Sequence, residues 1–174
     1  MKKISFSRRW RSQMLAYSSL LFGAVWMTAC NDSYNNSNPG DGNTYTISAS
    51  LTGGQETPPN ASTGTGTLTG TYDPATYKLT YKITWNMISG APTGMHFHGP
   101  AAAGVAAPVV VGITGFPTDS TGSVSGSVVI TAGQAGDLLS GNWYVNIHTA
   151  KFPNGEIRGQ VVTSKMTSSP TPGY

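Results

Sequence analysis

Hydrophobic and polar residues alternate along several segments of the chain, and this pattern is typical of β-strands with one buried face. In the clearest segment, Tyr77–Trp85 (YKLTYKITW), every odd-numbered residue is large and apolar and every even-numbered residue is polar. Tyr45–Leu51 alternates in the same way. A period of two residues sends successive side chains to opposite faces of a sheet. Both segments are therefore predicted to be half-buried strands.

Shorter alternating segments, separated by Gly, Pro, Asn and Asp, bring the predicted total to about eight strands. The remaining six are Gly64–Tyr72, Thr93–His98, Pro108–Ile113, Gly122–Ile130, Asn142–Thr149 and Glu156–Thr163. One short helical turn is predicted at Thr131–Leu139, with Thr131 as its N-cap. Many short strands without a long helix predict an all-β fold, a Greek-key antiparallel sandwich or barrel.

Composition agrees with this fold class and excludes others. The 174 residues include 22 Gly and 11 Pro, and only 10% are charged, which argues against a helical bundle or coiled coil. The formal net charge of +3 arises from five basic residues that precede position 12. From Cys30 onward, the five basic and seven acidic residues leave a net charge of −2. A basic nucleic-acid-binding surface is therefore excluded.

The N-terminus has the features of an export signal. After the basic residues comes an apolar stretch of 14 residues, Met14–Met27, which is shorter than the ~20 that a membrane-spanning helix needs. The following Met27-Thr28-Ala29-Cys30 resembles the lipobox of bacterial lipoproteins, in which the cysteine is acylated. Residues 1–29 are therefore predicted to be a lipoprotein signal peptide and Cys30 the lipidation site. The alternative is an ordinary signal peptide that leaves a free thiol.

The rest of the chain divides into three parts. Residues 30–43 are predicted to be the lipidated cysteine and a flexible polar tether, 44–163 one domain, and 164–174 a flexible tail. The expected location is outside the cytoplasm, anchored to the cell envelope through the lipid. In a Gram-negative cell we expect the outer membrane, because Asn31 is not the Asp that retains lipoproteins at the inner membrane.

The three histidines are predicted to point away from the apolar core. His96 and His98 alternate with apolar neighbours, and His148 shares the polar face of its strand with Tyr144 and Asn146. Two imidazoles at positions i and i+2 of a strand, with a third from a neighbouring strand, suit copper or zinc. The alternative is a hydrogen-bonded cluster of surface histidines.

Glu156 and Arg158 alternate with apolar residues on the last strand. If this strand pairs with Asn142–Thr149 as a hairpin, both residues lie on the face that carries His148. Arg158 would then pair with Glu156 or hold an anionic ligand beside the histidines. The alternative is an exposed ion pair that contributes less than about 1 kcal/mol.

Several blocks of the sequence resemble the CHRD domain, a family named for chordin with many secreted and lipoprotein members in bacteria. The blocks are LTGGQETPP (Leu51–Pro59), MHFHGPAAAGVAAPVVV, VNIHT and GEIRGQ, and the resemblance spans residues 44–163. The family has no established general activity. Chordin's role as a growth-factor antagonist is not transferred, because most of that protein's architecture is absent from this chain.

The resemblance implies a fold like that of Cu,Zn superoxide dismutase, with an immunoglobulin-like sandwich as the alternative. His96-Phe97-His98 resembles the copper-binding strand of that enzyme, His148 its later copper ligand, and Arg158 its active-site arginine. Three histidines cannot supply the full bimetallic centre, so only a copper site with three histidines remains open.

These features lead to two main interpretations. The first is a non-catalytic binding module whose polar cluster (His96, His98, His148, Asn146, Glu156 and Arg158) binds a protein or glycan partner or stabilises the fold. The second is a copper-binding protein with superoxide dismutase-like redox activity. Its ligands are the three histidines, with Asn146 or Glu156 beside them and Arg158 steering an anion. Motifs for hydrolases or common cofactors are missing, so an enzyme is less favoured. A purely structural envelope protein is a third interpretation.

Overall fold

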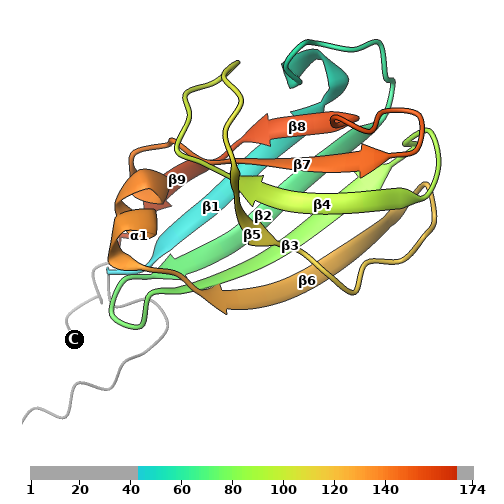
Figure 1. Ribbon diagram of the computed structural model, residues 1–174. Coiled ribbons are helices and arrows are strands. Elements are labelled where there is room, and N and C mark those ends of the chain that lie inside the picture. The colour runs from blue at the N-terminus through green and yellow to red at the C-terminus, as the bar shows by residue number, and fades with distance from the viewer. Residues whose placement is uncertain (1–42, 168–174) are drawn as a thin grey trace, which may run out of the picture. The chain divides into compact units, whose positions relative to one another are not determined.

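Nine strands form one antiparallel sheet in the computed structural model, which describes residues 43–167 (Figure 1). The strands are β1 (Tyr45–Thr52), β2 (Thr65–Asp73), β3 (Lys78–Asn86), β4 (Pro92–His98), β5 (Val109–Gly112), β6 (Gly122–Val129), β7 (Tyr144–Thr149), β8 (Ile157–Gln160) and β9 (Val162–Lys165). Their order is β5-β4-β7-β8-β1-β2-β3-β6, and β9 also pairs with β1. The predicted all-β antiparallel fold is confirmed.

The sheet curls so that β4, β5, β7 and β8 lie over β1, β2, β3 and β6 (Figure 1). An aromatic contact across the interior joins the two layers, because the rings of Tyr81 on β3 and Phe97 on β4 meet edge to face at 5.3 Å. Trp143, which is fully buried, packs against Phe97 at 5.9 Å. The apolar core is therefore enclosed between the two layers, as expected for a sandwich or barrel.

Strand β3 has the predicted alternation, with one exception. Leu79 and Ile83 are buried, whereas the even-numbered residues between them are exposed. Tyr77, predicted to share the buried face, is 40% exposed and has a φ of 54°. It ends the β2–β3 turn, in which the Asp73 carboxylate accepts hydrogen bonds from the Ala75 N–H and the Thr76 hydroxyl. The turn therefore takes Tyr77 out of the strand.

The predicted strand Glu156–Thr163 is divided between the two layers. Val161 is buried and its N–H donates to the Trp143 carbonyl at 2.8 Å, at the point where β8 ends. β9 then pairs with β1, from Val162 opposite Ser48 to Lys165 opposite Tyr45. Ser164 and Lys165, predicted to belong to the tail, are therefore part of the sheet.

The predicted helical turn is present as α1 (Ala132–Leu139), and a short 3-10 turn, η1 (Gly53–Gln55), was not predicted. Thr131 is the N-cap as expected, because its hydroxyl accepts from the Gln134 N–H and its own N–H donates to the Gln134 side chain. Between residues 43 and 167, no helix is long and apolar enough to cross a membrane. The predicted signal peptide, Cys30, the tether up to residue 42 and the tail from residue 168 lie outside the described residues.

We predict that Gly70→Ala destabilises the fold by about 2 kcal/mol, because a Cβ there has no room. It would meet the Thr80 carbonyl oxygen of β3 and the side chain of Ile47 on β1. Urea unfolding followed by tryptophan fluorescence measures this change. Thr69→Ala, on the exposed face of the same strand, is the control and should change stability by less than 1 kcal/mol. Equal unfolding midpoints for the two variants would contradict this close contact between β2 and β3.

Candidate metal centre

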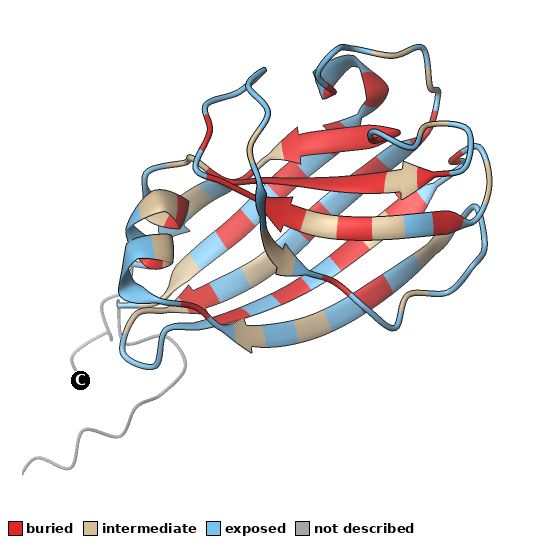
Figure 2. Cartoon of the chain, viewed as in Figure 1, coloured by how far each residue is buried: buried red, intermediate tan, exposed pale blue. Residues whose placement is uncertain are grey.

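Strands β7 and β8 are buried on both faces, whereas β1, β2 and β3 alternate between buried and exposed residues (Figure 2). Two loops, residues 53–60 and 99–108, cover their outer face. The Arg158 guanidinium donates to the Thr57 hydroxyl at 2.9 Å in one loop and to the Val105 carbonyl at 3.0 Å in the other. Beneath the loops, the outward side chains of β7 and β8 therefore form a polar layer, made up of the buried Tyr144, Asn146 and Arg158 and the partly buried Gln160.

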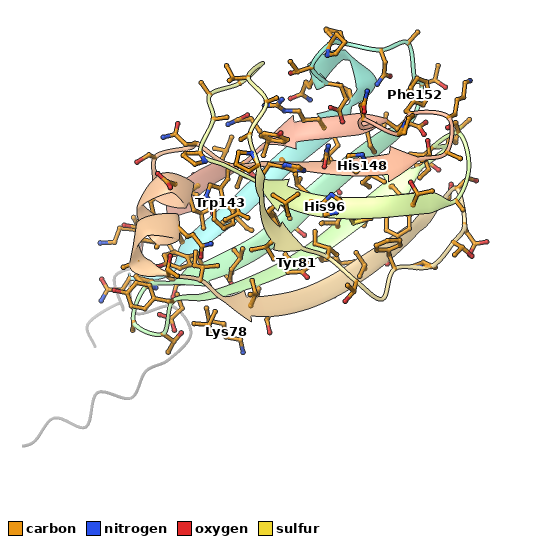
Figure 3. The ribbon with its side chains drawn as sticks, viewed as in Figure 1. Lys78, Tyr81, His96, Trp143, His148 and Phe152 are labelled. Atoms are coloured by element: carbon orange, nitrogen blue, oxygen red, sulfur yellow. The ribbon has the colours of Figure 1, made fainter. Side chains whose placement is uncertain are left out.

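The three histidines converge at the edge of this polar layer. His96 and His98 are on β4, His148 is on the adjacent β7, and one ring nitrogen from each lies within 4.8 Å of the other two. Among them, His96 Nδ1 and His148 Nε2 are 3.3 Å apart (Figure 3). His98 is buried, and the other two are partly exposed. The structure therefore brings together the three side chains that the sequence singled out.

Backbone carbonyls fix the orientation of two of the rings. His98 Nδ1 lies 2.9 Å from the Ala107 carbonyl oxygen, and His148 Nδ1 lies 2.9 Å from the Pro153 carbonyl oxygen. A carbonyl oxygen can only accept a hydrogen bond, so each Nδ1 carries the proton. In a neutral ring, Nε2 then offers a lone pair. Histidines that bind metals are commonly oriented in this way by a hydrogen bond from their second nitrogen.

Burial favours the neutral form of the rings. It lowers the pKa of His96, and the nearby rings of His148 and His98 lower it further. Burial also lowers the pKa of His98, although the Ala107 carbonyl and the Asn146 side-chain oxygen, which would both accept hydrogen bonds from a charged ring, oppose this effect. Both rings are therefore uncharged at neutral pH and have lone pairs available for a cation.

Asn146 lies between the histidines and a buried acid. Its Oδ1 is 3.1 Å from Nε2 of His98 and 3.1 Å from Nε2 of His148. Its amide also hydrogen-bonds the carboxylate of Glu56, which is 7% exposed. Burial raises the pKa of Glu56 to about 7, while the charge of Arg158 opposes this shift. Glu56 was not predicted to belong to the site, although it lies in the LTGGQETPP block.

Arg158 is not the partner of Glu156, contrary to one prediction. It is 2% exposed, and its guanidinium lies 3.5 Å from the centre of the Tyr144 ring. Tyr144 in turn stacks on His98, with 4.8 Å between ring centres. Because β7 lies between β4 and β8, Tyr144 separates Arg158 from His98. The acid that interacts with Arg158 is Glu56.

Glu156 is fully buried, and its partners are hydroxyl and backbone groups. Its carboxylate accepts four hydrogen bonds of 2.6–2.7 Å, from the Ser62, Ser89 and Thr149 hydroxyls and the Ser89 N–H. Burial alone would raise the pKa of Glu156, but these donors hold it below its ordinary value. Glu156 therefore ties together the end of β7, the β3–β4 loop and the segment before β2, and it makes no hydrogen bond to a described histidine.

We predict that Glu156→Gln lowers stability by about 3 kcal/mol at pH 7, because an amide cannot accept all four hydrogen bonds. A carboxyl with a lowered folded-state pKa stabilises the fold above its unfolded pKa of 4.5, and this contribution is lost as the pH falls through the folded pKa. The variant should therefore lose less stability than the wild type on acidification.

Denaturant unfolding between pH 3 and pH 8 tests this prediction. Asp119→Asn, the same chemical change at an exposed acid, serves as the control. Parallel pH profiles for the wild type and Glu156→Gln would show that the carboxylate charge does not stabilise the fold.

Comparison with known proteins gives one result that bears on this site. Residues 47–161, which include all three histidines and both buried acids, match the CHRD domain. Neither the curated proteins nor the solved structures contain a significant match. The resemblance to superoxide dismutase is therefore not shown by these comparisons. The CHRD match spans well over half of the chain, and we conclude that the chain belongs to the CHRD domain family.

Proposed function

We propose that this protein is a lipid-anchored CHRD module that binds one copper or zinc ion through His96, His98 and His148 outside the cytoplasm. The observation that carries the proposal is the convergence of three ring nitrogens within 4.8 Å. CHRD membership favours a binding module over an enzyme, and the geometry of the histidines points to the kind of ligand.

The donor set fits such an ion. Imidazole nitrogen is a preferred ligand of both copper and zinc. In tetrahedral coordination with bonds of about 2.05 Å, neighbouring donors are about 3.3 Å apart. The separation of His96 Nδ1 from His148 Nε2 is 3.3 Å. Two carbonyls hold the rings of His98 and His148, so little side-chain freedom is lost when a metal binds.

Burial favours a small ligand over a macromolecular partner at this cluster. Asn146 and Arg158 are each 2% exposed and Glu156 is 0% exposed, so none of them presents a surface to a protein or a glycan. Only His96 and His148 are partly exposed. A protein or glycan partner, if this module has one, would have to contact a different surface of the domain.

The proposal also covers where the protein is located and which redox chemistry a bound copper ion would allow. The lipobox-like segment ending at Cys30 supports attachment to the cell envelope. A bound copper ion would supply a one-electron couple, which is the chemistry of the superoxide dismutase-like alternative. Burial favours the neutral form of His96 and His98, and two backbone carbonyls orient the rings of His98 and His148. Tyr144 separates Arg158 from His98, so the arginine gives no support to a role in steering an anion.

We predict that the chain takes up one equivalent of Cu²⁺ or Zn²⁺ and that His96→Ala/His98→Ala/His148→Ala abolishes this uptake, since the variant lacks every imidazole. Calorimetry on EDTA-treated full-length protein, followed by metal analysis after dialysis, measures it. A Cys30→Ser background prevents thiolate binding. The superoxide assay is made on the copper-loaded protein.

The control for the triple variant is Thr67→Ala/Thr69→Ala/Thr84→Ala, three truncations on the side of β2 and β3 that faces away from the core. This variant should retain the metal. Equal metal content in the histidine variant and the wild type would refute the proposed function.

A further inference from the structure

We infer that the Asn146 side-chain oxygen is the fourth donor of the metal site and that the Glu56 carboxylate holds it in the donor orientation. This inference rests on the proposed metal-binding function. It adds one ligand and one positioning residue, and it changes the donor set from three nitrogens to three nitrogens and one oxygen.

Distances place Asn146 among the ligands. Its Oδ1 is 3.1 Å from Nε2 of His98 and 3.1 Å from Nε2 of His148, and the latter nitrogen is 3.3 Å from His96 Nδ1. These separations are close to the ~3.3 Å expected between neighbouring donors around a tetrahedral zinc ion. The amide oxygen is therefore as close to two of the ring nitrogens as ligands of one ion are to each other.

Hydrogen positions make this arrangement unfavourable without a cation. The Nδ1 protons of His98 and His148 point at the carbonyls of Ala107 and Pro153, so both Nε2 atoms face Asn146 Oδ1 with lone pairs. A proton on His96 Nδ1 would satisfy His148 Nε2. It would still leave the lone pairs of Asn146 Oδ1 and His98 Nε2 facing each other. A cation between the donors turns this repulsion into coordination.

Glu56 opposes the rotation that would relieve the repulsion. Turning the amide by half a rotation would direct its N–H groups at the histidines and its oxygen at the Glu56 carboxylate. In the observed orientation the amide instead hydrogen-bonds that carboxylate. One carboxylate oxygen, Glu56 Oε1, is buried and has no hydrogen-bond partner within residues 43–167. When Glu56 is ionised, rotation would therefore add a second unfavourable contact at a group that is already short of donors.

The loop that carries Glu56 and the β7–β8 turn that faces this loop together fix the position of the Glu56 carboxylate. Gly155 has a φ of 127°, and a Cβ there would meet the Glu56 carboxylate. The Asn60 amide donates to the carbonyls of Gly155 and Glu156, both at 3.1 Å, and so ties the loop to the β7–β8 turn. The absence of a side chain at Gly155 therefore lets the carboxylate approach Asn146.

Metal affinity and the visible spectrum of Co²⁺, used in place of Zn²⁺, test the inference. Asn146→Ala removes the oxygen donor and should weaken Zn²⁺ binding at least 10-fold and alter the Co²⁺ spectrum. Asn146→Asp keeps an oxygen donor and should bind at least as tightly as the wild type. Glu56→Gln should weaken binding about 10-fold, as expected when a group that orients a ligand is lost.

Glu156→Gln is the matched control, because it changes a buried carboxylate that contacts Ser62, Ser89 and Thr149 rather than Asn146. Its folded form should bind Zn²⁺ like the wild type. Wild-type affinity and an unchanged Co²⁺ spectrum in Asn146→Ala would overturn the inference while leaving the three-histidine site intact. Absence of metal binding by the wild type would overturn the proposed function itself. If Asn146→Ala does not fold, the inference about Asn146 and Glu56 would be overturned by two results together: wild-type Zn²⁺ affinity in Glu56→Gln and weakened Zn²⁺ binding in Asn146→Asp.

Discussion

The burial of β7 and β8 on both faces is the constraint on which the site depends. An outer sheet face that carries Tyr144, Asn146, Arg158 and Gln160 would ordinarily be exposed to water. Once the loops cover it, each polar group needs a partner, since an unsatisfied buried group costs about 1–3 kcal/mol. The loops supply these partners mainly through their backbones, as when Gln160 donates to the carbonyl of Ala101 at 2.8 Å. The loops therefore bury the polar side chains, and hydrogen bonds from these side chains in turn hold the loops in place.

The same requirement orients the histidines. Ala107 belongs to the loop that covers β7, and its carbonyl accepts the Nδ1 proton of His98. The Pro153 carbonyl in the β7–β8 turn does the same for His148. Neither contact involves a conspicuous side chain, but together they direct the two Nε2 atoms to one point. The site thus depends on backbone positions in segments that are not themselves regular structure.

Much of the fold was predictable because the alternation of hydrophobic and polar residues indicates on which face of a strand each side chain lies. The same alternation placed His96, His98 and His148 on one face, so the site residues could be named from the sequence. It does not report whether a loop covers that face. For this reason a pair between Glu156 and Arg158 was one of the alternatives that the sequence left open, whereas in the structure each residue is buried with other partners. The buried role of Glu56 was missed because it lies in a loop, where no periodicity applies.

The two buried glutamates show how a structural acid differs from one at a functional site. Four donors hold the pKa of Glu156 below its ordinary value, so its charge stabilises the fold at neutral pH. Glu56 has few donors, and burial raises its pKa to about 7. Stability is therefore lost as the pH rises from 4.5 through about 7, where the folded protein must ionise Glu56. If Glu56 served only to stabilise the fold, replacing it with a neutral side chain would raise the stability of the protein. Such unfavourable burial is typical of functional sites, and Glu56 lies one hydrogen bond from an amide that faces two histidines.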